Sequence, residues 1–448
     1  MKKHLLFFLI LTFFNLNANE NDIRIYLNTA ETLAPVYLSK MQSEGAELTE
    51  SHLTNLSEIL YFDLNHTGFT KIASSNDEYE KTLQEKNVHL AFDSVFWKKA
   101  GLDVVIKPFV TQKQLGCYVF QPKTGKLKQF KDIPLTGDLN QDRRIVHRLV
   151  DSVQKEVFNV MGVANTRILF SKQKSTENNV WQSEIWESDW DGYNERQVTF
   201  ENSYSITPVI LPPHPYFGKD RFIYVSYKIG QPKIFQSSIK ERTGKRIIDL
   251  RGNQILPAIS PKRDKIAFIC DASGRADLFI QPINADGQLS EKPLQLYSFP
   301  NATQASPTFS PDGSKIAFVS DKDGSPRIYT ISSKPGIKRV EPVMITKQNR
   351  ENICPAWSPD GTKLAFSAKT RDIRQIWIYD FESNEERQLT FGSGNKENPC
   401  WAPDSLHIVF NSTDPNSSEL YVVNLNQAEV LKITRGPGKK HYPAWGTR

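Results

Sequence analysis

Cysteine is scarce in this 448-residue chain, which contains only Cys117, Cys270, Cys354 and Cys400. Small disulfide-stabilised domains need a much higher cysteine density, so the sequence excludes that class of fold. It also lacks the Cys-x-x-Cys pairs and cysteine–histidine spacings that mark zinc sites. We therefore expect no metal and no cofactor. Cys270 stands where Ser320 stands in a repeat described below, which predicts a small core residue, and a Cys354–Cys400 bridge remains open.

Long hydrophobic runs are missing as well. The clearest one, Leu5–Phe14, has ten residues, about half of the ~20 that a membrane-spanning helix requires. It follows Lys2 and Lys3 and is followed by the small residue Ala18, which is the arrangement of a secretory signal peptide. We expect residues 1–18 to direct export, leaving a soluble chain that does not span a membrane; a retained membrane anchor is the alternative.

A strong excess of one charge is absent too. The chain carries 56 Lys and Arg against 50 Asp and Glu, a net charge of +6, and the charges are interspersed. Nucleic-acid binding proteins cluster their cations on one face, so no nucleic-acid partner is expected. With 39% hydrophobic and 24% charged residues, the composition is that of a folded chain rather than a disordered one.

The second half of the chain repeats one motif. Residues 306–320, SPTFSPDGSKIAFVS, align position by position with residues 354–368, CPAWSPDGTKLAFSA, and weaker copies begin at Leu256 and Asn398. Each copy runs from a short strand through a Pro-Asp-Gly turn into three further strands. Four antiparallel strands in about 45 residues form one blade of a β-propeller. The first prolines of the six copies are at positions 208, 257, 307, 355, 399 and 443.

The ends of the chain determine the number of blades. Five copies are complete, but Pro443–Trp445 is a first strand with nothing after it. The segments Arg167–Ser171, Ser183–Glu187 and Arg196–Thr199 are later strands without a first strand. Pairing these pieces completes a sixth blade and leaves no open sheet edge. The sequence therefore predicts a six-bladed β-propeller closed by pairing of its N- and C-terminal strands.

No such repeat occurs in residues 19–163. Apolar residues recur at helical spacing between Leu53 and Leu64, and a second amphipathic helix is expected over residues 140–160. A strand at Asp103–Lys107 and a hairpin spanning residues 118–130 complete a small α/β domain. The predicted fold class is α+β, with this N-terminal α/β domain at residues 19–163 and the six-bladed propeller at residues 164–448.

Catalytic groups are hard to find. Propeller peptidases add a hydrolase domain with a G-x-S-x-G motif, which this sequence lacks. Propeller lyases need converging histidines and carboxylates around a metal, and the propeller half has only His214, His407 and His441. We expect His407 to be a solvated strand residue. The sequence favours binding over turnover; a propeller enzyme (an oligosaccharide lyase or a peptidase-like protein) and a sugar- or peptidoglycan-binding scaffold are the alternatives.

A binding surface can be placed from the topology. In a propeller, the loops between blades and the loops between second and third strands emerge on one face, around the mouth of the central channel. The loops between blades are mixed in polarity, as suits a protein interface. The candidate partner-binding residues at this mouth are Asn253, Gln254, Leu256, Thr303, Gln304, Ala305, Glu351, Asn352, Lys396, Glu397 and His441.

Several segments together resemble one known family. They are Asp63–Ile72, Phe96–Val105, Gly162–Ile168, Ser188–Asn194 and the closing Pro443–Trp445. With the repeat, they resemble the TolB family, the periplasmic component of the Tol-Pal system of Gram-negative cell envelopes, over essentially the whole mature chain. The resemblance implies a monomeric periplasmic adaptor without enzymatic activity that supports outer-membrane integrity and constriction during cell division.

The resemblance also implies two partners. The peptidoglycan-associated lipoprotein Pal is expected at the channel mouth, with the family's contacts carried onto Asn253, Leu256 and Ala305. The inner-membrane protein TolA is expected to bind the first mature residues, of which Ile23, Arg24 and Ile25 match the family pattern. In the family, order and disorder of this segment are coupled to Pal binding. The residues themselves equally suggest an edge strand of the α/β domain.

Overall fold

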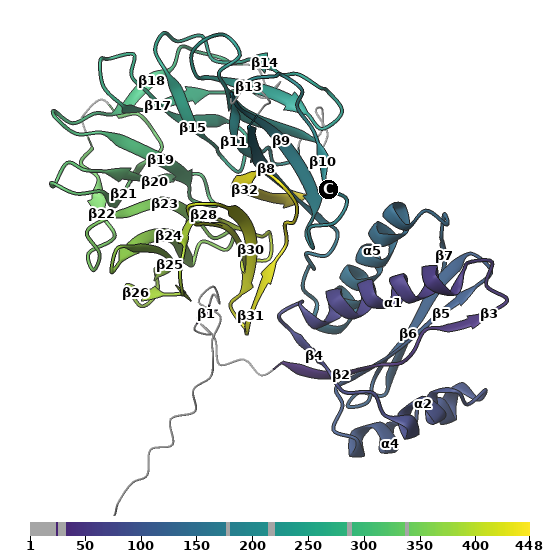
Figure 1. The fold of residues 1–448 in the computed structure, drawn as a ribbon. Helices are drawn as coiled ribbons and strands as arrows, with labels where there is room; N and C mark the ends of the chain where they lie inside the picture. Colours follow the sequence, from purple (N-terminus) through teal and green to yellow (C-terminus); the bar gives the residue numbers. More distant parts are fainter. Residues whose placement is uncertain (1–23, 26–32, 176–179, 214–219, 285–288, 337–339) are drawn as a thin grey trace, which may run out of the picture.

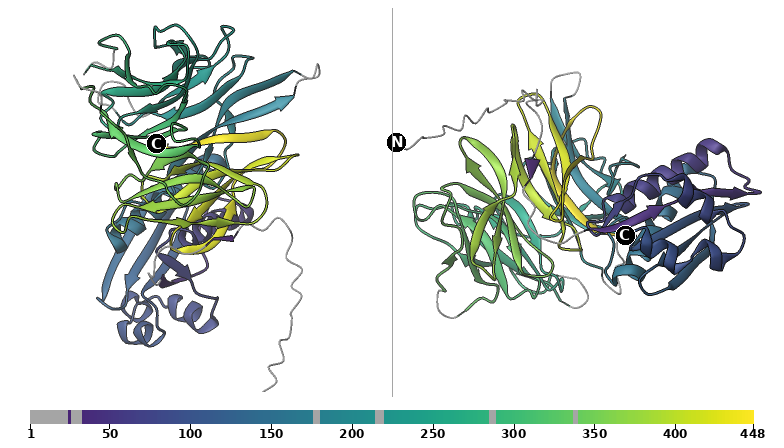
Figure 2. Two further views of the ribbon diagram at one scale, coloured as in Figure 1. Left: turned by 90° about the vertical axis from the view of Figure 1, so that its left-hand side faces the viewer. Right: turned by 90° about the horizontal axis from the view of Figure 1, so that it is seen from below.

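The computed structural model describes residues 24–25, 33–175, 180–213, 220–284, 289–336 and 340–448. The predicted signal peptide, Ile23 and His214 lie outside these residues. An α/β domain sits beside a ring of β-sheets (Figures 1 and 2). No helix in the described ranges has the length and apolar character to cross a membrane.

The N-terminal domain is built on one mixed sheet. Its strand order is β4-β2-β5-β6-β7, with β3 beside β5; strands β2 to β5 are parallel where they pair, and β5, β6 and β7 are antiparallel. The strands are β2 (Ala34–Leu38), β3 (Gln42–Glu44), β4 (Thr70–Ile72), β5 (Val104–Thr111), β6 (Gln114–Gln121) and β7 (Lys126–Pro134). The helices are α1 (Glu50–Asn65), α2 (Asp77–Leu83), α3 (Val88–Ala91), α4 (Ser94–Lys99) and α5 (Leu139–Phe158).

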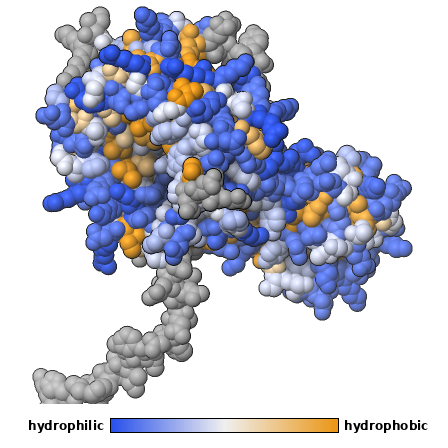
Figure 3. Space-filling model, turned by 45° about the horizontal axis from the view of Figure 1, so that its top comes forward, coloured by the Kyte–Doolittle hydropathy of each residue, from blue (hydrophilic) through white to orange (hydrophobic). Residues whose placement is uncertain are grey.

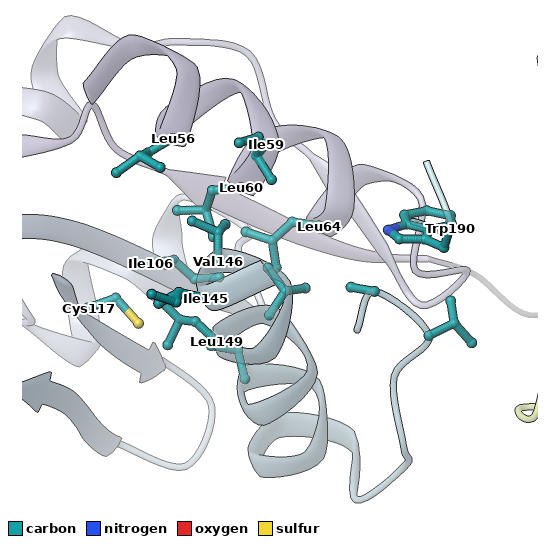
Figure 4. Packing of buried hydrophobic residues seen from close by; sticks show 14 of the residues in the cluster. Leu56, Ile59, Leu60, Leu64, Ile106, Cys117, Ile145, Val146, Leu149 and Trp190 are labelled. Atoms are coloured by element: carbon teal, nitrogen blue, oxygen red, sulfur yellow. The ribbon is translucent and has the colours of Figure 1, made fainter. Parts of the chain in front are cut away.

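Helices cover both faces of this sheet (Figure 1). The amphipathic helices α1 and α5 begin at the capping side chains of Thr49 and Asp138, each of which accepts a backbone N–H bond. Their apolar stripes pack on one face, and the short helices pack on the other around Trp97. Figure 4 shows Leu60 of α1 next to Val146 of α5 in the first core, with Trp190 of the propeller near the end of α1.

The ring has the six four-stranded antiparallel blades that the repeat predicts. Blade 1 consists of β32 (Lys439–Thr447), β8 (Thr166–Ser175), β9 (Trp181–Asp189) and β10 (Arg196–Gln197). Blade 2 consists of β11 (Ser205–Ile210), β12 (Arg221–Ser226), β13 (Lys233–Ser238) and β14 (Lys245–Arg246), and blade 3 of β15 (Gln254–Ile259), β16 (Lys265–Cys270), β17 (Asp277–Pro282) and β18 (Leu294–Tyr297).

Blades 4 to 6 follow the same order from the channel outward. Blade 4 consists of β19 (Gln304–Phe309), β20 (Lys315–Ser320), β21 (Arg327–Ser332) and β22 (Val343–Met344). Blade 5 consists of β23 (Asn352–Trp357), β24 (Lys363–Thr370), β25 (Ile373–Asp380) and β26 (Glu385–Gln388), and blade 6 of β28 (Asn395–Trp401), β29 (His407–Thr413), β30 (Ser418–Asn424) and β31 (Gln427–Lys432).

The C-terminal strand closes the ring, as predicted. Strand β32 pairs antiparallel with β8, and Trp445 lies opposite Ile168. The Trp445 side chain is buried, and its indole N–H donates to Thr166 Oγ1 over 2.7 Å. The innermost strand of blade 1 therefore comes from the end of the chain, while the other three strands come from its middle (Figure 1).

The Pro-Asp-Gly turn survives where its sequence is lost. In blade 4, Gly313 takes a left-handed φ of 72°, and Ser310 donates to the carboxylate of Asp312. Blade 3 has Lys262 and Arg263 in place of Asp and Gly, and Arg263 adopts the left-handed conformation itself with φ 56°. Non-glycine residues reach this region at a steric cost. The neighbouring strands therefore impose the turn.

The cysteines are free thiols. Cys270 is buried in the innermost layers of blade 3, as expected of a small core residue, and its thiol contacts the carbonyl of Arg251. The bridge between Cys354 and Cys400 that the sequence left open is not formed. The thiol of Cys354 instead contacts Asn398 Oδ1 at 3.2 Å. These residues act as small core and channel side chains.

The α/β domain rests on blade 1, within which the ring is closed by β32, and on the neighbouring blade 6. The turn after α1 meets blade 6, where Gln427 and Asn426 bond the backbone of Asn65 and Gly68 over 2.7–3.1 Å. Trp190 of blade 1 donates to Asp63 Oδ1 at 3.0 Å. One hydrophobic cluster runs continuously from the α1–α5 core to Ile433 and other propeller residues.

The N-terminal strand belongs to the propeller. Strand β1 (Arg24–Ile25) pairs antiparallel with β27 (Thr390–Phe391), a segment of the connection between blades 5 and 6. The interpretation of this segment as an edge strand of the α/β domain is therefore wrong. A two-residue pairing leaves little signal in the sequence, because any short extended segment can form it.

Candidate partner-binding surface

The two faces of the propeller are occupied differently. Successive strands of a blade run in opposite directions, so the turns after its first and third strands lie on one face. The α/β domain covers that face at the turns preceding His407 and Gln427. The loops between blades and those between second and third strands lie on the opposite face, which we call the mouth face.

Four of the predicted mouth residues do not offer their side chains to a partner. Gln254, Gln304 and Asn352 are the first residues of the innermost strands of blades 3, 4 and 5, and Lys396 is the second residue of that strand in blade 6. The side chains of all four residues are buried. Gln254 Nε2 donates to the carbonyl of Leu250 at 2.8 Å, and Asn352 Nδ2 donates to Asn349 at 2.7 Å. These side chains therefore hold the loops from within.

Lys396 is the clearest case. Its ammonium group donates to the carbonyls of Gly392 at 2.8 Å and Gly394 at 3.0 Å, and it also bonds Ser393. Burial lowers the pKa of Lys396 to about 8. A buried ammonium is tolerated because three carbonyl oxygens replace its water. This lysine folds the loop that contains β27, and the sequence alone did not distinguish it from a surface cation.

Asn253 and Thr303 are exposed, and they occupy equivalent places in blades 3 and 4. Asp271 accepts from the backbone N–H of Asn253 at 2.6 Å and from its side chain at 2.8 Å. Asp321 accepts from the backbone N–H of Thr303 at 2.7 Å and from its hydroxyl at 3.0 Å. Each aspartate fixes one loop against its neighbour, so these two loops are preorganised for binding.

The mouth is charged at blades 5 and 6. Arg374 lies 3.2 Å from Glu351 and 3.2 Å from Glu397, and Lys369 lies 3.5 Å from Glu351. Burial raises the pKa of Glu397, and the positive charge of Arg374 opposes that shift. The predicted residues Glu351 and Glu397 thus share one arginine, and this part of the mouth offers charge where blades 3 and 4 offer neutral polar groups.

At the centre of the mouth face is a hollow of about 140 Å³ lined by six residue–proline pairs, one from each innermost strand. The residue before each proline is left-handed, with φ between 46° and 53°, at a bulge in the strand pairing. Leu256 belongs to this ring, and Ala305 immediately precedes Ser306 of the ring. The buried hydroxyl of Thr207 has no hydrogen-bond partner among the described residues.

His441, the last of the predicted set, is partly buried beside this hollow. Burial lowers its pKa to about 4, with a further contribution from the charge of Lys439. The ordinary value is 6.5, so between pH 6.5 and 4 the unfolded chain takes up a proton that the folded chain refuses. Below pH 6.5 this histidine therefore destabilises the fold.

The variant His441→Gln tests this directly. Relative to the variant, the natural protein is expected to lose stability as the pH falls from 7 to 4.5, by at most roughly 1.4 kcal/mol per pH unit. The measurement is the free energy of unfolding of both proteins by urea at each pH. A difference between the two proteins that stays constant across this range would contradict the assignment.

The sequence missed a buried cluster between the domains. His147 Nδ1 lies 2.6 Å from Asp63 Oδ2, and His147 Nε2 lies 3.6 Å from Asp191, which also pairs with Arg143. Burial alone would lower the pKa of His147, but the carboxylates of Asp63 and Asp191 raise it. The Asp63–His147–Asp191 spacing would also suit a metal ion. In this geometry, however, the groups form ion pairs and hydrogen bonds that join α1 and α5 to blade 1.

His407 contradicts its predicted role as a solvated strand residue. It is buried, its Nδ1 lies 2.6 Å from Asp404, and its Nε2 lies 2.8 Å from the carbonyl of His66 in the other domain. In other copies of the repeat, the first residue of the equivalent strand is at least partly exposed to solvent. The repeat contains no information about the α/β domain, which covers His407 in blade 6. Position within the repeat could not reveal this contact.

Of the N-terminal segment, the structure describes Arg24 and Ile25, whose backbone pairing with β27 places them next to the loop that Lys396 holds. Residues 390–397 therefore connect this strand to Glu397 at the mouth. The two surfaces predicted separately from the sequence are neighbours in the fold.

Comparison with known proteins agrees with this architecture. Residues 155–448 match the family model described as the TolB beta propeller domain. The protein named "Protein TolB homolog" of Protochlamydia amoebophila is 45% identical over 394 residues, covering 86% of this chain and 83% of the relative. The protein of the same name from Chlamydia trachomatis is 33% identical, covering 84% and 80%.

A solved structure extends the comparison to both domains. The crystal structure of TolB from Acinetobacter baumannii superposes with a TM-score of 0.74 and covers 95% of this chain and 100% of that one. At 17% identity this likeness concerns the fold alone. The family model, the sequence relatives and the six-bladed ring with its α/β domain agree, and the chain belongs to the TolB family.

Proposed function

We propose that this protein is a periplasmic adaptor without enzymatic activity, which binds a Pal-like lipoprotein at the mouth face and a TolA-like inner-membrane protein through its N-terminal segment. Membership of the TolB family makes it a component of the Tol-Pal system. In this role it would support outer-membrane integrity and constriction during cell division, as a monomer.

The observation that carries the proposal is the mouth face itself. It lies opposite the face that the α/β domain covers, and its loops are held in place by Asp271, Asp321 and buried side chains such as Lys396. Rigid polar loops around a central hollow provide hydrogen-bonding groups at little entropic cost. The refined set of exposed or half-buried candidates is Asn253, Leu256, Thr303, Ala305, Glu351, Glu397 and His441.

The cysteines give no support to the enzyme alternative. Burial raises the pKa of Cys117 to about 12 and the pKa values of Cys354 and Cys400 to about 11. Thiols with such values stay protonated at neutral pH and are poor nucleophiles. Turnover of oligosaccharides or peptides by the purified protein would favour the alternative over an adaptor.

The neighbouring position of the two surfaces supports coupling between the partners. A lipoprotein that displaces Glu397 or its arginine would act on the loop from Gly392 to Lys396, which begins at β27. Because the pairing of β1 with β27 spans only two residue pairs, a change in the path of β27 would weaken it. Release of the N-terminal strand would then expose it to the second partner, an order–disorder switch.

The mouth is tested by the variants Asn253→Arg and Ala305→Arg. Each places a long cation on a preorganised polar loop, and we expect at least about a tenfold loss of affinity for the soluble domain of a Pal-like lipoprotein, about 1.4 kcal/mol. Calorimetric titration measures the affinity, and circular dichroism verifies that the ring remains folded.

The matched control is Ser383→Arg, which adds the same side chain to an exposed position in the turn between β25 and β26, on the opposite face. It should bind the lipoprotein as the natural protein does. Unchanged binding by both mouth variants would refute the proposed surface.

A further inference from the structure

The α/β domain contains a groove that the proposed function does not use. Its volume is about 810 Å³, and it runs between α1 and the segments that follow β2 and β4. Strands β2 and β4 are parallel, so these segments leave the same edge of the sheet. Open α/β sheets bind ligands beyond the carboxyl ends of their parallel strands, because the loops diverge there and leave a crevice.

One wall of the groove is the flank of α1 beside its buried stripe, and Leu53 and Phe62 on this flank also pack against the hydrophobic core. Leu53, Tyr61 and Phe62 recur at helical spacing along this wall. The floor is formed by Leu38 and Ile72, with Met41 and Ala73 beside them. The side chain of Tyr61 is 50% exposed, so a large aromatic ring of this wall is open to contact from outside. Figure 3 shows a mostly hydrophilic surface on which apolar side chains form separate patches. A large groove with an apolar floor is unusual on such a surface and points to a binding role.

The charges around the groove have one dominant sign. Glu50 and Glu58 project from α1 and Glu80 from α2, whereas Lys40 is the one cation among the lining residues. In the described part of the chain, none of the three carboxylates forms an ion pair with a lysine or arginine; Glu80 accepts hydrogen bonds from the Tyr37 hydroxyl at 2.7 Å and the Lys40 N–H at 3.1 Å. The groove therefore combines an apolar floor with an acidic rim.

The groove also touches the contact between the domains. The ring of Phe62, which lines the groove, lies 4.4 Å from the ring of His66 and 5.4 Å from the ring of Trp190. His66 and Trp190 are the side chains through which α1 meets blades 6 and 1. An occupant packed against Phe62 would therefore contact the domain junction through a single aromatic side chain.

We propose that this groove docks a peptide segment of a partner protein in which apolar side chains alternate with lysine or arginine. The apolar side chains fill the floor around Leu38, Phe62 and Ile72, and the cations pair with Glu50 and Glu58 at the rim. This surface is separate from the mouth face and from β1, so it provides a third contact that does not depend on the proposed function.

The test selects twelve-residue peptides from a random phage-displayed library on the immobilised full chain. We expect the selected peptides to combine apolar residues with at least two lysines or arginines. A synthetic peptide of the consensus is then titrated by fluorescence anisotropy against the natural protein and the variants Glu58→Lys and Tyr61→Ser, for each of which we expect at least a tenfold loss of affinity. Raising the salt concentration should weaken binding, because the rim charges are exposed.

The matched control is Glu78→Lys, the same charge reversal on an exposed residue of α2 that does not line the groove. It should change the affinity by less than twofold. Selected peptides without a basic bias, selection of no peptide, equal binding by Glu58→Lys, or self-association of the chain through this groove in sedimentation would each overturn the proposal.

Discussion

Removing residues 439–448 is expected to leave a chain that no longer forms a cooperative ring. Blade 1 then loses its innermost strand, and β8 presents an unpaired edge to the channel. The buried side chains of Ala444 and Trp445 are lost together with a nine-residue strand, seven residues of which pair with β8. Since folded domains are stable by only about 5–15 kcal/mol, we expect this loss to abolish the thermal unfolding transition seen by calorimetry and to produce aggregates in size-exclusion chromatography.

Single substitutions in the same strand make this prediction quantitative. Trp445→Ala should cost about 3–5 kcal/mol, because it empties a buried site and leaves the Thr166 hydroxyl without its indole donor. Thr447→Ala is the control, since Thr447 is exposed in the same strand, and it should change the free energy of unfolding by less than about 0.5 kcal/mol. Equal stability of the two variants in urea unfolding would show that the C-terminal strand does not close the ring.

Trp190→Ala is expected to separate the two domains. The Trp190 side chain is 1% exposed, its ring lies 5.4 Å from Phe62, and its indole donates to Asp63. Truncation of such a buried aromatic costs about 3–5 kcal/mol and leaves a buried carboxylate oxygen unpaired. We expect a single unfolding transition in the natural protein and two in the variant, with faster proteolysis of the α/β domain.

The companion variants distinguish packing from hydrogen bonding. Trp190→Phe retains most of the ring contact and loses only the bond to Asp63, so its cost should fall between zero and that of alanine. Trp181→Ala removes the same type of side chain from β9, where it is 52% exposed, and should be nearly neutral. A neutral Trp190→Ala variant with unchanged proteolysis would contradict the proposed role of this contact.

The sequence predicted the ring because its determinants are local. The prolines from Pro208 to Pro443 recur at nearly constant spacing, and the unpaired Pro443–Trp445 strand indicated how the ring closes. What could not be predicted depends on contacts between distant segments. The repeat cannot show that His407 is covered by another domain, or that β1 pairs with β27.

Prediction of the mouth was limited in a similar way. The loops between blades could be located from the repeat, but exposure within them alternates between neighbouring residues: Asn253 is exposed and Gln254 is buried. Lys396 looked like a surface cation because nothing in its sequence shows that the carbonyls of Gly392 and Gly394 surround it. Burial of polar side chains under a loop is decided by the path of the backbone, which a short polar sequence does not specify.

The α/β domain contacts both blade 6 and blade 1, the blade that the last strand of the chain, β32, completes. For blades 1 and 6 to part, the bonds from Gln427 to Asn65 and from Trp190 to Asp63 must break as well. The same bonds hold the α/β domain on the propeller. The covalent connection between Phe158 and Thr166 is therefore not what keeps the two domains together. A protease nick in that stretch would leave a two-fragment particle still assembled, held by the contacts between the domains and by the pairing of β1 with β27.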